Sequence, residues 1–160
     1  MSNIKSIINN KDSILVFDVD GVLAKLEFGE YNHFMSDLEW ELANKNGINH
    51  YREDKVIKKM QEFLSNRNMD NIYVATVISA SDEEKNKIEY LTKYYNIKKD
   101  NIYYVPSNDD KLGVMLEIAK KHPNINPRQI VLIDDTVTIL NDIMNNSQFS
   151  TAHISSFFDI

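Results

Sequence analysis

Cysteine is absent from the chain, which excludes disulfide bonds, thiolate catalysis and cysteine-ligated metal centres. Long apolar runs are missing too, and none approaches the roughly 18 residues that a membrane-spanning helix requires. The first residues are largely polar, with one short apolar patch at Ile7 and Ile8, so we do not expect them to act as a signal peptide. A cytoplasmic protein with no membrane partner is therefore the default expectation.

An excess of basic charge is also lacking. The chain has 18 lysines and arginines against 24 aspartates and glutamates, a net charge of -6, and the two signs alternate along it. That balance argues against a nucleic-acid polymer as partner, because backbone binding requires a basic surface. An acidic protein can still bind a small phosphorylated molecule if a cation and a few donors reverse the field locally. With 160 residues, 42% of them hydrophobic, we expect one domain with a real core.

Apolar patterning predicts alternating strands and helices. Four apolar runs predict strands: residues 13–18, 71–79, 101–106 and 129–134. Three segments with apolar residues at helical spacing predict helices: 82–95, 111–122 and 137–144. Near-continuous Ile, Leu and Val runs are typical of strands buried on both faces of a parallel sheet. We therefore predict an α/β fold, a Rossmann-like three-layer αβα sandwich, with an edge strand and a tail within 147–160.

Residues 24–67 form too long a connection for a simple crossover between strands. Helices are predicted within it at 36–44 and 54–64. We interpret 24–67 as a small helical cap inserted after the first strand, with 1–23 and 68–160 forming the core. Such an insertion commonly forms a lid over the carboxyl end of a sheet. Its aromatic residues are candidates either for stacking on a nucleotide base or for the core of the cap: Phe28, Tyr31, Phe34 and Trp40.

Two aspartates lie at the end of the first predicted strand. Asp18 and Asp20 are two residues apart, so we expect their side chains on the same side of the chain. Like charges at that distance repel unless a cation lies between them, and hard oxygen ligands suit Mg²⁺, which takes further ligands from water and phosphate. Gly21 permits a sharp turn and a close ligand. Two solvated acids at a strand end are the alternative interpretation.

A second pair of aspartates, Asp134 and Asp135, ends another buried strand. Ligands of open α/β sheets bind outside the carboxyl ends of the strands. An uncompensated charge buried there would cost several kcal/mol, so we predict that both residues ligate the metal. For Asp135, and for Thr136 after it, capping of the following helix is the alternative.

Phosphate oxygens need donors at the same edge of the sheet. The hydroxyl of Thr76 or Ser79 is a candidate, because the second predicted strand carries both near its end. Lys111 begins a predicted helix directly after a strand and could supply a positive charge. Together with the four aspartates, these residues predict a Mg²⁺-dependent phosphoryl-transfer site.

The combined pattern resembles the haloacid-dehalogenase (HAD) superfamily of phosphohydrolases, across four signature segments and thus most of the chain. Residues 18–22, Asp-Val-Asp-Gly-Val, are similar to the first motif of the family, Asp-x-Asp-Gly-(Thr/Val). Lys111 resembles the third-motif lysine, and Asp134 with Asp135 resembles the acidic fourth motif. Thr76 and Ser79 both qualify for the second motif. The run 72–79 looks most like the branch related to 5'(3')-deoxyribonucleotidases, which favours Thr76.

The resemblance implies a role for each aspartate of the first motif. Asp18 would be the nucleophile that forms an aspartyl-phosphate, and it would also ligate Mg²⁺. Asp20 would be the general acid for the leaving group and then the base for water, and it would reach the metal through its side chain or its backbone carbonyl. The expected substrate is a small phosphorylated metabolite, with a nucleoside 5'-monophosphate as one option.

Three other functions use similar residues. A phosphotransferase or mutase acting on sugar phosphates would need the same groups. A phosphate-accepting receiver domain also combines acids, a threonine and a lysine on a parallel sheet, but receivers carry no insertion of some forty residues after the first strand, and their acid pair comes early in the chain. A binding module without catalysis would be expected to lack a catalytic position, and all are filled here.

Overall fold

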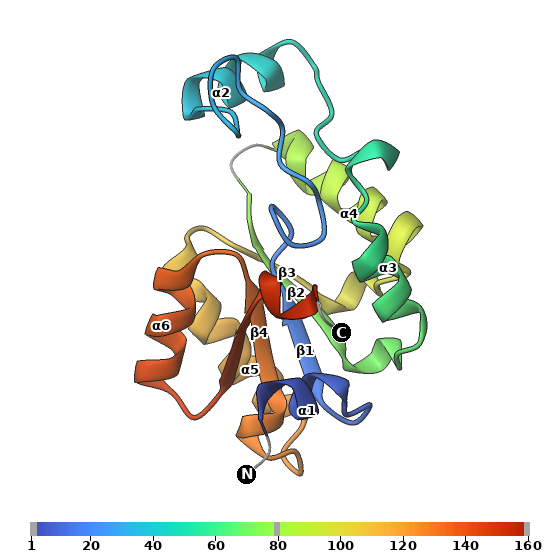
Figure 1. The fold of residues 1–160 in the computed structure, drawn as a ribbon, viewed down its shortest axis with the longest axis vertical. Helices are drawn as coiled ribbons and strands as arrows, with labels where there is room; N and C mark the ends of the chain where they lie inside the picture. The colour runs from blue at the N-terminus through green and yellow to red at the C-terminus, as the bar shows by residue number, and fades with distance from the viewer. Residues whose placement is uncertain (1–2, 79–80, 159–160) are drawn as a thin grey trace.

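The computed structural model describes residues 3–78 and 81–158, and this part of the chain contains one five-stranded parallel sheet (Figure 1). The strand order is β3-β2-β1-β4-β5. The strands are β1 (Ile14–Phe17), β2 (Ile72–Val77), β3 (Ile102–Val105), β4 (Ile130–Asp134) and β5 (Ser150–His153). The predicted α/β fold with a parallel sheet is confirmed, and β5 is the edge strand expected near the end of the sequence.

Helices cover both faces of the sheet. Their bounds are α1 (Ile4–Asn9), α2 (Asp37–Lys45), α3 (Lys58–Ser65), α4 (Ser81–Tyr95), α5 (Lys111–Lys121) and α6 (Val137–Asn146). Alternate residues of the central strands enter two separate apolar clusters. Leu15 and Phe17 pack with residues of α3 and α4 on one face, whereas Ile14 and Val16 pack with residues of α5 and α6 on the other. This is the three-layer arrangement predicted from the apolar runs.

The segment between β1 and β2 has two parts. Helix α2 begins after a capping box, in which the Ser36 hydroxyl accepts from the Glu39 N–H and the Glu39 carboxylate accepts from the Ser36 N–H. It lies at the end of the molecule opposite the N-terminus (Figure 1). Helix α3 instead packs beside α4 and buries Met60 and Leu64 in the cluster that contains β1. The limits 24–67 for the cap remain a prediction.

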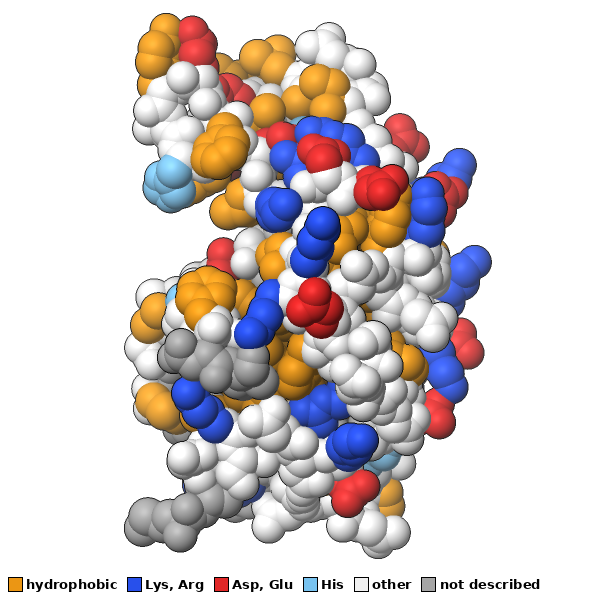
Figure 2. All heavy atoms as spheres, turned by 45° about the vertical axis from the view of Figure 1, so that its right-hand side comes forward, with side chains coloured by type: hydrophobic (Ala, Val, Ile, Leu, Met, Phe, Trp, Pro, Cys, Tyr) orange, Lys and Arg blue, Asp and Glu red, His pale blue; other side chains and the backbone are white. Residues whose placement is uncertain are grey.

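The surface is hollowed between the α2 end of the molecule and the body that contains the sheet (Figure 2). Apolar side chains gather on the α2 end in the same view. Exposed apolar residues of the insertion include Phe28, Tyr31, Phe34, Leu38 and Leu42. The described part of the chain contains no helix of the length and apolarity needed to cross a bilayer.

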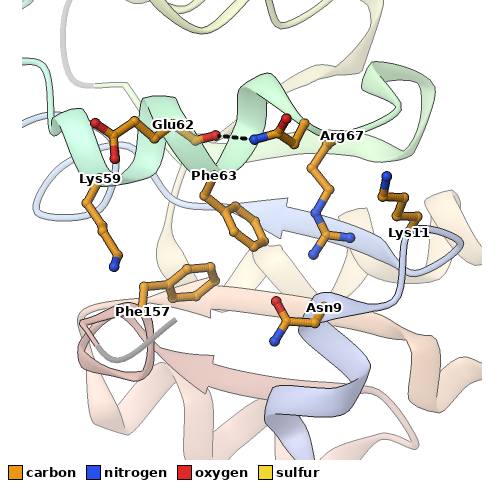
Figure 3. A pocket seen from close by; sticks show the side chains of 8 residues that line it. Asn9, Lys11, Lys59, Glu62, Phe63, Arg67 and Phe157 are labelled. Atoms are coloured by element: carbon orange, nitrogen blue, oxygen red, sulfur yellow. Dashed lines mark hydrogen bonds between the residues drawn. The ribbon is translucent and has the colours of Figure 1, made fainter.

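A cavity of about 300 Å³ lies between α3, the segment after α1 and the C-terminal turn Ile154–Phe157 (Figure 3). The rings of Phe63 and Phe157 meet edge to face there, with centroids 5.0 Å apart. Arg67 stacks on Phe63 and donates to the backbone carbonyls of Ile8 and Asn10. Of the predicted site residues that the structure describes, none lines this cavity.

Candidate active site

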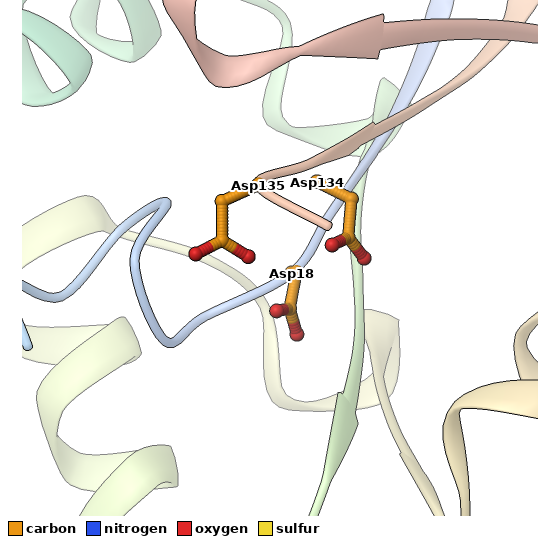
Figure 4. Close-up of side chains that lie close together, drawn as sticks. All are labelled: Asp18, Asp134 and Asp135. Atoms are coloured by element: carbon orange, nitrogen blue, oxygen red, sulfur yellow. The ribbon is translucent and has the colours of Figure 1, made fainter. Parts of the chain in front are cut away.

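Three aspartates meet where β1 and β4 end. The parallel register pairs Phe17 with Ile133, and the Asp18 N–H donates to the Ile133 carbonyl at 2.9 Å. Asp134 is the last residue of β4 and Asp135 follows it. One carboxylate oxygen from each of Asp18, Asp134 and Asp135 lies within 4.8 Å of the others (Figure 4). The structure thus brings these three predicted metal ligands together.

Lys111 is buried against two of these carboxylates. Its side chain is fully buried, and its Nζ lies 3.1 Å from Asp18 Oδ1 and 2.7 Å from Asp134 Oδ2. The site therefore has three carboxylates against the one ammonium group of Lys111. If all four groups are ionised, two negative charges remain in a place where solvent screens them little.

Burial and mutual repulsion make the charged state of the cluster costly. Burial raises the pKa of Asp18 to about 7. The positive charge of Lys111 lowers this pKa, but the negative charges of Asp134 and Asp20 raise it and so counter the lysine. Burial and the neighbouring Asp134 also raise the pKa of Asp135. A divalent cation between these oxygens would remove the repulsion, and carboxylate oxygens with room for water are the ligands that Mg²⁺ prefers. The residues present thus fit this ion.

The turn at Gly21 makes room for Asp135. Gly21 has a φ of +79°, and a Cβ placed on it would lie 2.2 Å from Asp135 Oδ2. The Asp135 carboxylate accepts from the Thr136 hydroxyl at 3.2 Å, and Asp134 Oδ1 accepts from the Thr136 N–H at 2.9 Å. Thr136 occupies the N-cap position of α6, and its side chain makes no capping hydrogen bond. The structure therefore does not use Asp135 as the cap that the alternative interpretation suggested.

Asp20 lies apart from the other three carboxylates. Its Oδ2 is 2.9 Å from Lys87 Nζ, and its Oδ1 accepts from the Tyr51 hydroxyl at 3.0 Å. The side chains of Asp18 and Asp20 therefore have different partners in the structure, and metal contact through the Asp20 side chain stays a prediction. Side chains alternate regularly only within a strand, and β1 ends at Phe17 before both aspartates. Metal contact through the Asp20 backbone carbonyl stays a prediction.

Lys87 is the centre of this second cluster. The side chain is fully buried, and Nζ lies 2.9 Å from Glu83 Oε1. Nζ also donates to Thr76 Oγ1 at 3.0 Å and to the Val77 carbonyl at 2.6 Å. Thr76 is itself buried, so its hydroxyl contacts the lysine beside Asp20. Its role as a phosphate ligand stays a prediction, and Ser79, the other candidate, lies outside the described residues.

Sequence reasoning missed Lys87, Glu83 and Tyr51. The signal in the sequence is a Glu–Lys pair four residues apart on a helix, and this spacing is typical of exposed pairs. Tyr51 comes from the insertion, 31 residues away from Asp20 along the chain, with no periodic pattern around it. Only the fold shows that these side chains lie next to the Asp-x-Asp segment.

The aromatic residues of the insertion behave differently from one another. Trp40 stacks on His50, with centroids 3.7 Å apart and planes at 13°, so it packs within the insertion as a cap-core residue would. Phe28 and Tyr31 are 79% and 87% exposed.

Glu27 anchors the segment before α2, because its carboxylate lies 2.5 Å from both Arg52 and Lys55.

The comparisons with known proteins give little beyond this geometry. No protein-family model matches the chain, and no curated protein does. Among solved structures, the chain is similar to the HAD domain of effector protein Lem4 from Legionella pneumophila, at 17% identity over 92% of both chains with a TM-score of 0.48. An inactive mutant of that domain aligns at 17% identity over 92% of this chain and 91% of the other, with a TM-score of 0.49.

Proposed function

We propose that this chain is a Mg²⁺-dependent phosphohydrolase of the HAD type, which cleaves a small phosphomonoester through an aspartyl-phosphate on Asp18. The observation that carries the proposal is the convergence of Asp18, Asp134 and Asp135, two of which contact the buried Lys111. The cluster lies at the carboxyl end of a parallel sheet, where α/β proteins bind their ligands. Its surplus of negative charge is what a divalent cation would balance.

Asp18, Asp134 and Asp135 would hold the metal. When bound, Mg²⁺ supplies positive charge that lets a phosphate approach a carboxylate nucleophile. Lys111 orients Asp18 through Oδ1 and places an ammonium group beside it. That charge stabilises the equatorial phosphate oxygens as negative charge spreads over them in the transition state.

The reaction proceeds in two steps, each with a balanced proton transfer. In the first, a carboxylate oxygen of Asp18 bonds to phosphorus, the bond from phosphorus to the leaving oxygen breaks, and Asp20 gives that oxygen a proton. In the second, a water oxygen bonds to phosphorus, the bond from phosphorus to the Asp18 oxygen breaks, the proton of the water goes to Asp20, and inorganic phosphate leaves. Splitting hydrolysis in this way replaces one difficult step by two easier ones.

Within this activity we propose a nucleoside 5'-monophosphate as the first substrate class to test. Phe28 and Tyr31 support it, because they are highly exposed apolar rings of the insertion and aromatic rings stack on nucleobases. Trp40 is already stacked on His50, so we do not propose it as a residue that stacks on the base.

Hydrolysis of p-nitrophenyl phosphate, with Mg²⁺ and with EDTA, tests the proposal. We expect activity with Mg²⁺ alone and its loss in Asp18→Asn, which keeps the size of the side chain and removes the nucleophile. Asp109→Asn is the matched control, because Asp109 is an exposed aspartate in the turn before Lys111. Full activity of Asp18→Asn would sink the nucleophile assignment. A stable phosphoprotein after treatment with acetyl phosphate would favour the receiver function, and transfer to sugar phosphates would favour a phosphotransferase.

A further inference from the structure

The contacts of Asp20 involve two side chains that the phosphohydrolase proposal leaves without a role. Lys87 reaches Oδ2 from α4, and Tyr51 reaches Oδ1 from the insertion. Both oxygens of the carboxylate are therefore engaged by donors, from two different parts of the fold. The Asp20 side chain is nevertheless 33% exposed, so it remains accessible from the solvent side.

Lys87 is buried in a way that a simple packing role does not require. Burial by itself disfavours the ammonium form, but the negative charges of Asp20 and Glu83 outweigh it, and the pKa of Lys87 is raised. A protonated lysine without solvent exposure is costly unless its partners are well placed. Here it has four oxygen partners: Asp20, Glu83, Thr76 and the Val77 carbonyl.

Tyr51 connects the insertion to this lysine. Its hydroxyl lies 3.0 Å from both Asp20 Oδ1 and Glu83 Oε1, and Lys87 Nζ lies 5.3 Å from the centre of its ring. Burial raises the pKa of Tyr51, so the hydroxyl keeps its proton and remains a donor. The ring packs against Tyr90 of α4, with centroids 6.0 Å apart, which holds the hydroxyl in place.

We propose that Lys87 and Tyr51 are positioning residues for Asp20, which orient its carboxylate for proton exchange with the leaving group and stabilise its charge. The inference rests on the proposed phosphohydrolase function. The contacts in the structure are those of the ionised carboxylate, with one donor against each oxygen. This is the form that a protonated Asp20 reaches once the leaving oxygen has taken its proton. Donors that already surround a group stabilise the charge that develops on it in the transition state, and they lower the activation barrier because they need not move during the reaction. Neither side chain has to touch the substrate.

The leaving group of the substrate provides the test. p-Nitrophenolate departs as a stable anion and needs little protonation, whereas an alkoxide needs a proton. We therefore compare kcat/KM for p-nitrophenyl phosphate and for glycerol phosphate in wild type, Tyr51→Phe, Lys87→Met and Asp20→Asn. General acid catalysis contributes roughly 10²–10⁴-fold, so we expect each positioning variant to lose about tenfold more on glycerol phosphate than on p-nitrophenyl phosphate. Asp20→Asn should likewise lose more kcat/KM on glycerol phosphate than on p-nitrophenyl phosphate, and by a larger factor than the positioning variants.

Several controls separate positioning from structural damage. Lys85→Met removes a lysine of the same helix whose side chain is 77% exposed, and it should leave kcat/KM unchanged for both substrates. Tyr51→Phe removes a single oxygen and keeps the ring against Tyr90, so it decides the question even if Lys87→Met does not fold. Equal losses on both substrates, or no loss, in Tyr51→Phe would overturn the inference. The proposed function fails separately, if Asp18→Asn stays active or wild type hydrolyses neither ester.

Discussion

Two fully buried lysines contact the Asp-x-Asp segment, and each forms an ion pair with one of its aspartates. Lys111 joins Asp18 to Asp134, and Lys87 joins Asp20 to Glu83. The first cluster contains a third carboxylate, that of Asp135. The second cluster has no corresponding third carboxylate among its described contacts and contains instead the hydroxyl groups of Tyr51 and Thr76.

The difference between these clusters is one of charge balance. Three carboxylates and one ammonium group leave a surplus of two negative charges around Lys111, and a divalent cation would cancel it. Two carboxylates and one ammonium group leave one negative charge around Lys87, where hydroxyl donors share the stabilisation. The comparison teaches that neighbouring acidic positions can acquire different chemistry through their partners alone.

Removing either lysine should have the largest effect on stability. Lys111→Met and Lys87→Met each leave two acids without their cation, and breaking a buried ion pair in this way costs about 3–5 kcal/mol. The loss should be smaller for Lys87, because solvent screens the partly exposed Asp20. Urea unfolding with and without Mg²⁺ measures both, and the ion should restore stability to Lys111→Met alone. Equal rescue of both variants would contradict the distinction between the clusters.

Removing one acid from each cluster should separate their affinities for metal. Asp134→Asn takes a charged ligand from the first cluster, and we expect Mg²⁺ binding to weaken roughly tenfold or more, because ligand charge sets the affinity of such sites. Glu83→Gln makes the matching change in the second cluster and should leave binding unaltered. Isothermal titration calorimetry with Mg²⁺ gives both values. The metal assignment is wrong if the two variants weaken binding alike.

The turn beside Asp135 should tolerate no side chain. In Gly21→Ala the new Cβ would meet Asp135 Oδ2, and the backbone would have to keep a φ of +79°. A residue other than glycine in that conformation costs about 1–3 kcal/mol. Gly113→Ala is the control, because Gly113 lies within α5 with nothing within 4 Å of its Cβ position, and alanine there should stabilise by about 0.5–1 kcal/mol. Urea unfolding should therefore show opposite signs, and equal signs would refute this account.

Loss of the Tyr51 hydroxyl should have the smallest effect on stability. Tyr51→Phe removes one donor shared between Asp20 and Glu83, and such a hydrogen bond contributes about 0.5–1.5 kcal/mol. Thermal unfolding should therefore find the variant folded and only slightly less stable than wild type. A loss as large as that of Lys87→Met would show that Tyr51 holds the insertion in place more than it holds Asp20.

Strand and helix positions in the core were predictable from local patterns. The run 129–134 is almost continuously apolar, and the structure places β4 at Ile130–Asp134. Helix α5 begins at Lys111, as the spacing of apolar residues indicated. The insertion was less predictable. The helix expected at 54–64 is replaced in the structure by a short turn at Glu53–Lys55 and the helix α3, which begins only at Lys58. Local periodicity identifies an element, but contacts with the rest of the molecule decide where it begins.

The first cluster was determined by the sequence alone to a large extent. Parallel strands that end in acids must bring those acids to one edge of the sheet, so the meeting of Asp18, Asp134 and Asp135 follows from the strand pattern. The partners of Asp20 were decided only by the tertiary structure. Lys87 and Tyr51 reach it from a helix and an insertion that no periodicity relates to β1, because long-range contacts depend on how whole elements pack rather than on spacing along the chain.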